Sequence, residues 1–269
     1  MITTKEQNIP YTTDEMLKDY TEYYQFHDSD SPLEARAFLR SALLNSISKK
    51  LEKQSKVTIL DMGGGKQIFE QEAGCDKSFA KILNRVSWVT IDISAIPRDK
   101  MLATSVAEPT QANGAELPFG SNIFDIIFSS MAIDFMPRSS FSEVKRVIKN
   151  DGELLINFHH PSLIKAAGMA MPEALKKLHS ARKNLYHKKN NGSSKTLQAL
   201  EKLTKAEIQY KDITFLLNNF PAHVFSDSDE IFNFLMNHFS DSQIEVSEHQ
   251  KSLVKNNSWF FAQVLLSTD

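Results

Sequence analysis

Three consecutive glycines follow an apolar run near residue 60, and this combination can bring the backbone close to a ligand. The run from Val57 to Asp61 has the β-forming, mostly uncharged composition of a parallel strand that is covered on both faces. Gly63, Gly64 and Gly65 come almost directly after it. Because glycine has no side chain, the chain can turn sharply there or approach a bound group closely. The pattern predicts a buried strand that ends in a ligand-binding turn.

A second strand pattern, from Trp88 to Asp92, ends on a carboxylate. A strand, a glycine turn, a helix and a second strand ending in an acid can hold a ribose-bearing cofactor in α/β folds. A dinucleotide is excluded because the last glycine of G-x-G-x-x-G would fall on Ile68. A phosphate-binding P-loop is excluded because Gln67 stands where Ser or Thr is needed. The glycine turn therefore matches neither of these two motifs.

The glycine turn resembles the first motif of class I S-adenosylmethionine-dependent methyltransferases, of the small-molecule, methyltransferase domain 11-like type. The family pattern is close to L-D-x-G-x-G-x-G; Leu60, Asp61, Gly63 and Gly65 match it, and Gln67 replaces the last glycine. Further segments resemble the family in the expected order and extend the match over residues 57–160: Asp92 to Ser94, Asn113 to Phe119, Phe124 to Pro137 and Glu143 to Ile156.

The resemblance implies an α/β fold: a doubly wound, mostly parallel seven-stranded sheet of the Rossmann-like methyltransferase kind. It implies a helical N-terminal cap and a helical insertion before the last two strands, of which the final one is antiparallel. We expect the cap over residues 1–53, the cofactor-binding core over 54–160, the insertion or lid over 161–240, and the last two strands over 241–269. In this superfamily such insertions usually cover the substrate.

Apolar periodicity and capping residues predict elements within this plan. A stripe with four-residue spacing predicts a helix from a cap at Ser31 to about Glu52: Leu39, Leu43, Ile47 and Leu51. Serine, threonine or aspartate with glutamate three residues later predicts three helix starts, at Ser140, Thr204 and Asp227. Residues 105–112 form the weakest strand pattern because they include Pro109. Residues 67–76 are interpreted as excess loop, with the helix restarting near Ser78, and Pro172 as an interruption of the inserted helices.

The resemblance also implies which residues hold S-adenosylmethionine: Asp61, Gly63, Gly64, Gly65, Asp92, Ile93, Asn113, Gly114 and Ser129. The carboxylate of Asp92 would accept hydrogen bonds from the ribose hydroxyls, each contributing about 1.5–3 kcal/mol. Asp61 could orient the amides of the turn. Asn113 would accept a bond from the adenine amino group, with Gly114 offering its amide; an ordinary turn residue is the alternative for Asn113.

Methyl transfer needs few catalytic groups, because a sulfonium already activates the methyl and the protein chiefly aligns the reactants. A base is required only where the acceptor loses a proton. The candidates are His160, after the fifth strand, and Asp134, after the fourth. Since neighbouring strand residues face opposite ways, one of His159 and His160 should face the pocket. A structural histidine and a helix-capping Asp134 are the alternatives. A metal site is rejected because the histidine pair has no third ligand at suitable spacing.

Composition sets the remaining expectations. The net charge of −2 gives no basic field for nucleic acid, and Cys75 is alone, which excludes an internal disulfide. No apolar run reaches the length of a membrane span, and the polar N-terminus is unlike a signal peptide, so we expect a cytoplasmic protein. A basic run over residues 176–189 is a solvated face or a contact for an anionic substrate, an acidic partner or a lipid surface. The sequence does not indicate the oligomeric state.

We therefore expect an enzyme that transfers a methyl group from S-adenosylmethionine to an oxygen or nitrogen atom of a small molecule. Two alternatives remain. A non-catalytic or regulatory binding protein of the same fold is suggested by Gln67 and the long segment behind it, and a protein methyltransferase is also compatible. Nucleic-acid amino methylation is disfavoured, because residues 128–131 read Phe-Ser-Ser-Met where that family has Asn/Asp-Pro-Pro-Tyr/Phe.

Overall fold

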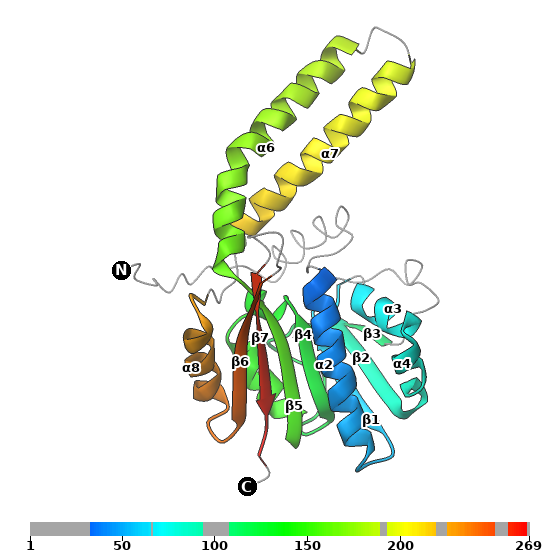
Figure 1. Ribbon diagram of the computed structural model, residues 1–269, viewed down its shortest axis with the longest axis vertical. Coiled ribbons are helices and arrows are strands. Elements are labelled where there is room, and N and C mark those ends of the chain that lie inside the picture. The colour runs from blue at the N-terminus through cyan, green and yellow to red at the C-terminus, as the bar shows by residue number, and fades with distance from the viewer. Residues whose placement is uncertain are drawn as a thin grey trace.

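The computed structural model describes residues 33–65, 67–93, 108–188, 193–218, 225–250 and 258–267. Seven strands in this part form one sheet in the order β3-β2-β1-β4-β5-β7-β6 (Figure 1). They are β1 (Val57–Met62), β2 (Val86–Asp92), β3 (Glu108–Gln111), β4 (Phe124–Ser130), β5 (Ile148–His159), β6 (Gln243–Gln250) and β7 (Ser258–Leu265). The predicted cap at Ser31 lies outside the described residues.

The sheet is parallel from β3 to β5, and β7 runs antiparallel to both β5 and β6. This confirms the predicted fold class, including the reversed final strand. The strand order changes direction beside β1, and α/β sheets bind ligands at such a point, beyond the carboxyl ends of the strands. The fold therefore places the ends of β1, β2 and β4 together.

Helices cover both faces of the sheet (Figure 1). One face is covered by α2 (Leu33–Leu51), α3 (Ile68–Cys75) and α4 (Lys77–Ala80), and the other by α5 (Ser139–Val147) and α8 (Ser228–His238). The predicted stripe on α2 is confirmed, because its four residues are all buried: Leu39, Leu43, Ile47 and Leu51. Each such buried side chain contributes about 1.5–3 kcal/mol of hydrophobic free energy.

Pro109 lies inside β3, in the strand pattern that the sequence supports least. β3 pairs only with β2, so it is an edge strand of the described sheet. Proline has no N–H to donate and is tolerated in such a strand.

Four local predictions are wrong. Residues 68–75 form helix α3 and are not loop; its first residue follows Gln67, whose φ is +57°. Ser140 does not cap a helix, because α5 already begins at Ser139, and its predicted partner Glu143 bonds Leu117 and Arg146 instead. Thr204 lies within α7 (Ser193–Asn218), and Pro172 lies within α6 (Pro161–Lys188). At these positions the tertiary contacts and the length of the helices outweigh the capping and proline signals in the local sequence.

The predicted helix start at Asp227 is confirmed, since the N–H of Glu230 donates to the Asp227 carboxylate at 2.9 Å.

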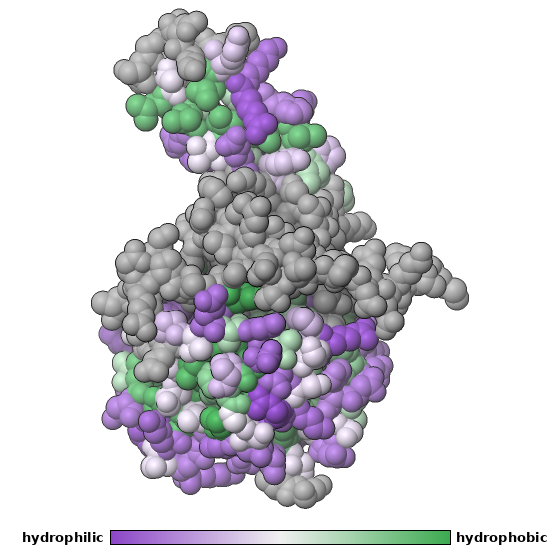
Figure 2. Space-filling view, turned by 180° about the vertical axis from the view of Figure 1, so that it is seen from behind, coloured by the Kyte–Doolittle hydropathy of each residue, from purple (hydrophilic) through white to green (hydrophobic). Residues whose placement is uncertain are grey.

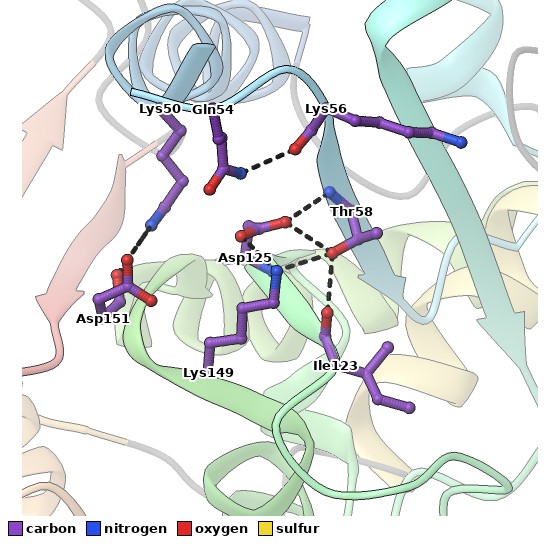
Figure 3. A network of polar contacts seen from close by, with 8 residues as sticks. All are labelled: Lys50, Gln54, Lys56, Thr58, Ile123, Asp125, Lys149 and Asp151. Carbon is purple, nitrogen blue, oxygen red and sulfur yellow. Dashed lines mark hydrogen bonds and ion pairs between the residues drawn. The ribbon is translucent and has the colours of Figure 1, made fainter. Parts of the chain in front are cut away.

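A polar network ties the amino-terminal ends of the central strands together, opposite the candidate site (Figure 3). Buried Asp125 on β4 accepts hydrogen bonds from the N–H and the hydroxyl of Thr58 on β1, both at 2.7 Å. Its other carboxylate oxygen lies 2.7 Å from Nζ of Lys149. Burial alone would raise the pKa of Asp125, but these bonds outweigh it and lower that pKa. Asp125 is therefore a charged anchor between β1 and β4.

Helices α6 and α7 pair into a long hairpin, the helical arm, which projects away from the sheet (Figure 1). α6 begins at Pro161, directly after His160 and the end of β5. The arm has its own small core, formed by Leu178, Ala181 and Ala206. No helix among the described residues is long and apolar enough to cross a membrane.

Candidate active site

The glycine turn after β1 is held against β2 and β4. The N–H groups of Gly63 and Gly64 donate to the carbonyl oxygen of Ile91 at 2.9 and 3.1 Å. Gly63 has a φ of +82° and Gly65 a φ of +50°, the left-handed region that favours glycine. A Cβ on Gly63 would overlap Ala132, the second residue after β4. The turn therefore needs glycine for both its dihedral angles and its close approach to β4.

Asp92 lies at the end of β2 and bonds the glycine turn directly. The N–H of Gly65 donates to Oδ2 of Asp92 at 2.9 Å, and the N–H of Ala112 donates to its backbone carbonyl at 2.9 Å. The residue is only 5% exposed. The predicted ribose-binding carboxylate thus also orients an amide of the turn, which is the role considered for Asp61. Ile93 follows at the same strand end, where its carbonyl oxygen accepts a bond from the Gln111 side chain.

Asp61 faces a second buried acid, Glu70 of α3, beneath the glycine turn. A Cβ on Gly64 would overlap Thr90 and lie 2.6 Å from Oδ2 of Asp61 and 3.1 Å from Oε1 of Glu70. The hydroxyl of Thr90 donates to Glu70. Burial raises the pKa of both carboxyls, and the neighbouring Glu70 raises that of Asp61 further. The two side chains share a proton more readily than they carry two charges.

The segment after β3 turns back across the end of β1. Oδ1 of Asn113 accepts a hydrogen bond from the N–H of Ala115 at 3.0 Å, the local bond of an asparagine turn. Gly114 is buried, and a Cβ there would lie 2.6 Å from Sδ of Met136 and 3.4 Å from Cε of Met62. Met136 also approaches Gly63, at 3.2 Å from the position of its Cβ. Half-buried Met136 therefore spans the gap between the two glycine-containing segments, and no motif in the sequence indicated it.

Ser129 fixes the end of β4. Its hydroxyl donates to the carbonyl oxygen of Met62 on β1 at 2.9 Å and accepts a bond from the N–H of Ile133 at 2.9 Å. Ile133 begins the short 3₁₀-helix η3 (Ile133–Phe135). Ser129 thus fixes the start of η3 relative to the end of β1, beside the glycine turn.

Asp134 of η3 holds His159, the last residue of β5. The N–H of His159 donates to Oδ2 of Asp134 at 2.9 Å, and Nδ1 of its ring lies 2.7 Å from the same oxygen. Both side chains are buried, and Oδ1 of Asp134 has no hydrogen-bond partner among the described residues. Because α5 begins only at Ser139, Asp134 is not a helix cap.

The predicted candidate His160 is oriented differently. Its Nδ1 lies 2.7 Å from the hydroxyl of Ser162, and its Nε2 lies 3.3 Å from a carboxylate oxygen of Glu248 on β6. Its ring also contacts Phe260, on the face of the sheet opposite to His159. The structure thus brings Asp134 together with His159, and places His160 beside β6. The alternation of side chains along a strand predicts that the two histidines face opposite sides of the sheet. Only the tertiary structure shows that His159 is the one that contacts Asp134.

Comparison with known proteins agrees with this geometry. The family model described as a methyltransferase domain matches residues 60–156, from the end of β1 into β5. This match covers residues 60–156 of the 269-residue chain and agrees with the resemblance of the glycine turn to class I S-adenosylmethionine-dependent methyltransferases. The recognition and the enzyme class predicted from the glycine turn are confirmed. A search of curated protein sequences finds no match.

Solved structures show the same fold in other proteins. The plantazolicin methyltransferase BpumL, in complex with a pentazolic desmethylPZN analogue and SAH, is 13% identical, with 94% of this chain and 91% of that chain covered and a TM-score of 0.51. The DszA carbon methyltransferase is 12% identical, with 91% and 56% covered and a TM-score of 0.54. The N-methyltransferase NodS from Bradyrhizobium japonicum WM9, in complex with S-adenosyl-L-homocysteine, is 10% identical, with 92% and 98% covered and a TM-score of 0.50.

The residues at these strand ends have chemistry that fits S-adenosylmethionine. The glycine turn offers backbone without side chains, and Asp92 offers a buried carboxylate at the end of β2. Gly114 packs against Met136 and Met62, with the hydroxyl of Ser140 3.4 Å from the position of its Cβ. These groups lie on the segments that the sequence assigned to the cofactor.

Proposed function

We propose that this methyltransferase modifies an oxygen or nitrogen atom of a small molecule, with His159 taking the proton that the acceptor loses. The observation that carries the proposal is the buried pair of Asp134 and His159 at the ends of β4 and β5. β4 lies between β1, which carries the glycine turn, and β5, which carries His159. The pair therefore stands beside the cofactor segments on the side away from Asp92.

The pair has the chemistry of a general base. An ionised carboxylate only accepts hydrogen bonds, so Nδ1 of His159 carries the proton in the contact with Asp134. The lone pair is then on Nε2, and Asp134 stabilises the positive charge that His159 acquires when it takes a proton. When bound, S-adenosylmethionine supplies an electrophilic methyl group on a sulfonium. A hydroxyl or ammonium acceptor needs such a base, whereas an acceptor with a free lone pair does not.

We propose the following roles for the cofactor segments. Asp92 accepts the ribose hydroxyls, while its bond to Gly65 keeps the turn in place. Gly63 and Gly64 let the backbone approach the cofactor, and Asn113 and Gly114 flank the adenine. Asp61 supports the turn from below, together with its neighbour Glu70. Ser129 and Ile93 fix the ends of β4 and β2 through their hydrogen bonds to Met62 and Gln111. We further propose that residues 54–160 form the cofactor-binding core.

The test separates binding from chemistry. Calorimetry with S-adenosylmethionine and with its demethylated product measures cofactor affinity. Release of the demethylated product is then followed with a panel of small hydroxyl, phenol and amine acceptors. We expect His159→Gln to keep cofactor affinity and to lower kcat by about 10²–10⁴-fold. The adjacent variant His160→Gln is the matched control, because His160 lies on the other face of the sheet.

Each result bears on a different part of the proposal. A His159→Gln protein as active as the wild type would remove the base, and a larger loss in His160→Gln would transfer the role to that residue. A protein that binds the cofactor but methylates no acceptor in the panel would rule out the small-molecule assignment. A protein with no affinity for S-adenosylmethionine would overturn the proposal entirely.

A further inference from the structure

The helical arm, residues 161–218, ends far from the strand ends that carry the active site (Figure 1). Its helices contain 28 and 26 residues, so at a rise of about 1.5 Å per residue each is about 40 Å long. The two helices bury only a narrow seam between them, in which Ala181 and Ala206 meet Leu178. Leu203 and Tyr210 pack partly buried against this seam, whereas several other large apolar side chains of the arm are exposed.

Three large apolar side chains are exposed at the distal end of the arm. Tyr186 is 79% exposed in the last turn of α6, and Leu197 and Leu200 are 69% and 51% exposed in the first turns of α7. Leu197 and Leu200 are three residues apart and so are neighbours on one helix face. Single exposed apolar residues are ordinary on protein surfaces, but a cluster at the end of a projecting hairpin indicates a contact surface.

The arm is also strongly cationic. Residues 161–218 contain 11 lysines and arginines against 4 acids, although the whole chain has a net charge of −2. Its glutamates pair with cations of the arm itself: Glu173 with Lys177 at 3.0 Å, Glu201 with Lys205 at 2.9 Å, and Glu207 with Arg182 at 3.2 Å.

These ion pairs do not neutralise all of the lysines of the arm. Lys176, Lys183 and Lys202 are exposed and form no ion pair in the described part of the arm. Figure 2 shows apolar and hydrophilic side chains next to one another on the upper part of the arm. The distal surface therefore combines exposed apolar groups with uncompensated positive charge.

We propose that the distal end of the helical arm binds an anionic lipid surface. Tyr186, Leu197 and Leu200 enter the interfacial layer, and Lys183 and Lys202 contact the anionic headgroups. The apolar residues come from both helices and share one end of the hairpin. A nucleic acid would satisfy the lysines and leave the leucines in water. The arm thereby holds the catalytic sheet at a membrane surface without crossing it.

The expected effects follow from the two kinds of contact. A lysine near an anionic bilayer contributes about fivefold to binding, so Lys183→Gln with Lys202→Gln lowers vesicle affinity about 25-fold. Burying a leucine side chain is worth about tenfold or more, so Leu197→Ser with Leu200→Ser lowers it by about 10²-fold. These substitutions lie on exposed positions, and circular dichroism checks that the helix content is unchanged.

The experiment measures co-sedimentation of the full chain with two kinds of vesicle. One consists of phosphatidylcholine, and the other of phosphatidylcholine and phosphatidylglycerol in equal parts. Two controls match the variants: Lys49→Gln with Lys53→Gln removes the same charge from the sheet domain, and Met169→Ser removes an exposed apolar side chain (75% exposed) near the base of the arm. We expect binding to the anionic vesicles only, lost in the distal variants and kept in both controls.

Three results would overturn the proposal. The first is no binding to the anionic vesicles, and the second is equal loss of binding in the control variants. The third is binding that depends on the lysines but not on the leucines, which would show that the apolar residues do not enter the interfacial layer. None of these results depends on methyl transfer, so the proposed function is tested separately.

Discussion

Gly63→Ala is expected to disturb both stability and cofactor binding, and its cost can be worked out from the structure. An alanine at a φ of +82° costs about 1–2 kcal/mol. Its Cβ would also overlap Ala132 and come within 3.2 Å of Met136, and such overpacking costs about 1–3 kcal/mol. The free energy of unfolding should therefore fall by about 2–5 kcal/mol. For a chain of this size that lowers Tm by about 4–20 °C.

Gly120→Ala is the matched control. Gly120 is exposed, its φ is not positive, and a Cβ there would meet only Ile123, at 3.4 Å. Alanine at such a position is neutral or stabilises by up to about 1 kcal/mol. Urea unfolding and calorimetric titration with S-adenosylmethionine compare the two variants with the wild type. Equal stability of the two variants, or unchanged cofactor affinity in Gly63→Ala, would refute the reasoning about the turn.

Three further substitutions test the buried carboxylates. Asp92→Asn keeps an acceptor for the turn but removes the charge, so calorimetry should show cofactor affinity about 10–100-fold weaker; unchanged affinity would exclude Asp92 from the site. For Glu70, the raised pKa means that the folded state binds more protons than the unfolded state as pH rises above the ordinary value, so stability falls with pH. Glu70→Gln should therefore raise Tm more at about pH 8 than at about pH 5, and a pH-independent difference would contradict this. Asp125 has a lowered pKa, so its contribution is present at neutral pH and lost in acid. Asp125→Asn should cost about 1–3 kcal/mol in urea unfolding at neutral pH and much less in acid, and the opposite trend would sink this account.

The strands could be predicted well because their signal is local. β1, β4 and β7 are mostly apolar runs, as expected for strands that are buried on both faces, and their few polar residues have specific partners or sites. The reversal of the last strand came from the family resemblance. Helix boundaries were less predictable: the capping signals at Ser140 and Thr204 are overridden, one by an earlier helix start and the other by a longer helix.

The sequence indicated which residues lie at the strand ends, but not which side chains contact one another there. The glycine turn and Asp92 directly follow or end apolar strands, so their place at the strand ends could be predicted from the local sequence. The partnership of Asp134 with His159 is formed by residues 25 positions apart, and that of Asp61 with Glu70 depends on a helix that the sequence did not indicate. Side-chain partners of this kind require the packing of elements that are remote in sequence.

The two edges of the sheet have a consequence for how the protein behaves at high concentration. An edge strand exposes unpaired backbone groups and can recruit a strand from another molecule. At one edge, Pro109 removes an N–H from β3. At the other, β6 carries exposed Glu245 and Glu248, whose charges would repel the same strand of a second copy. Both ends of the described sheet thus resist strand-by-strand growth into aggregates.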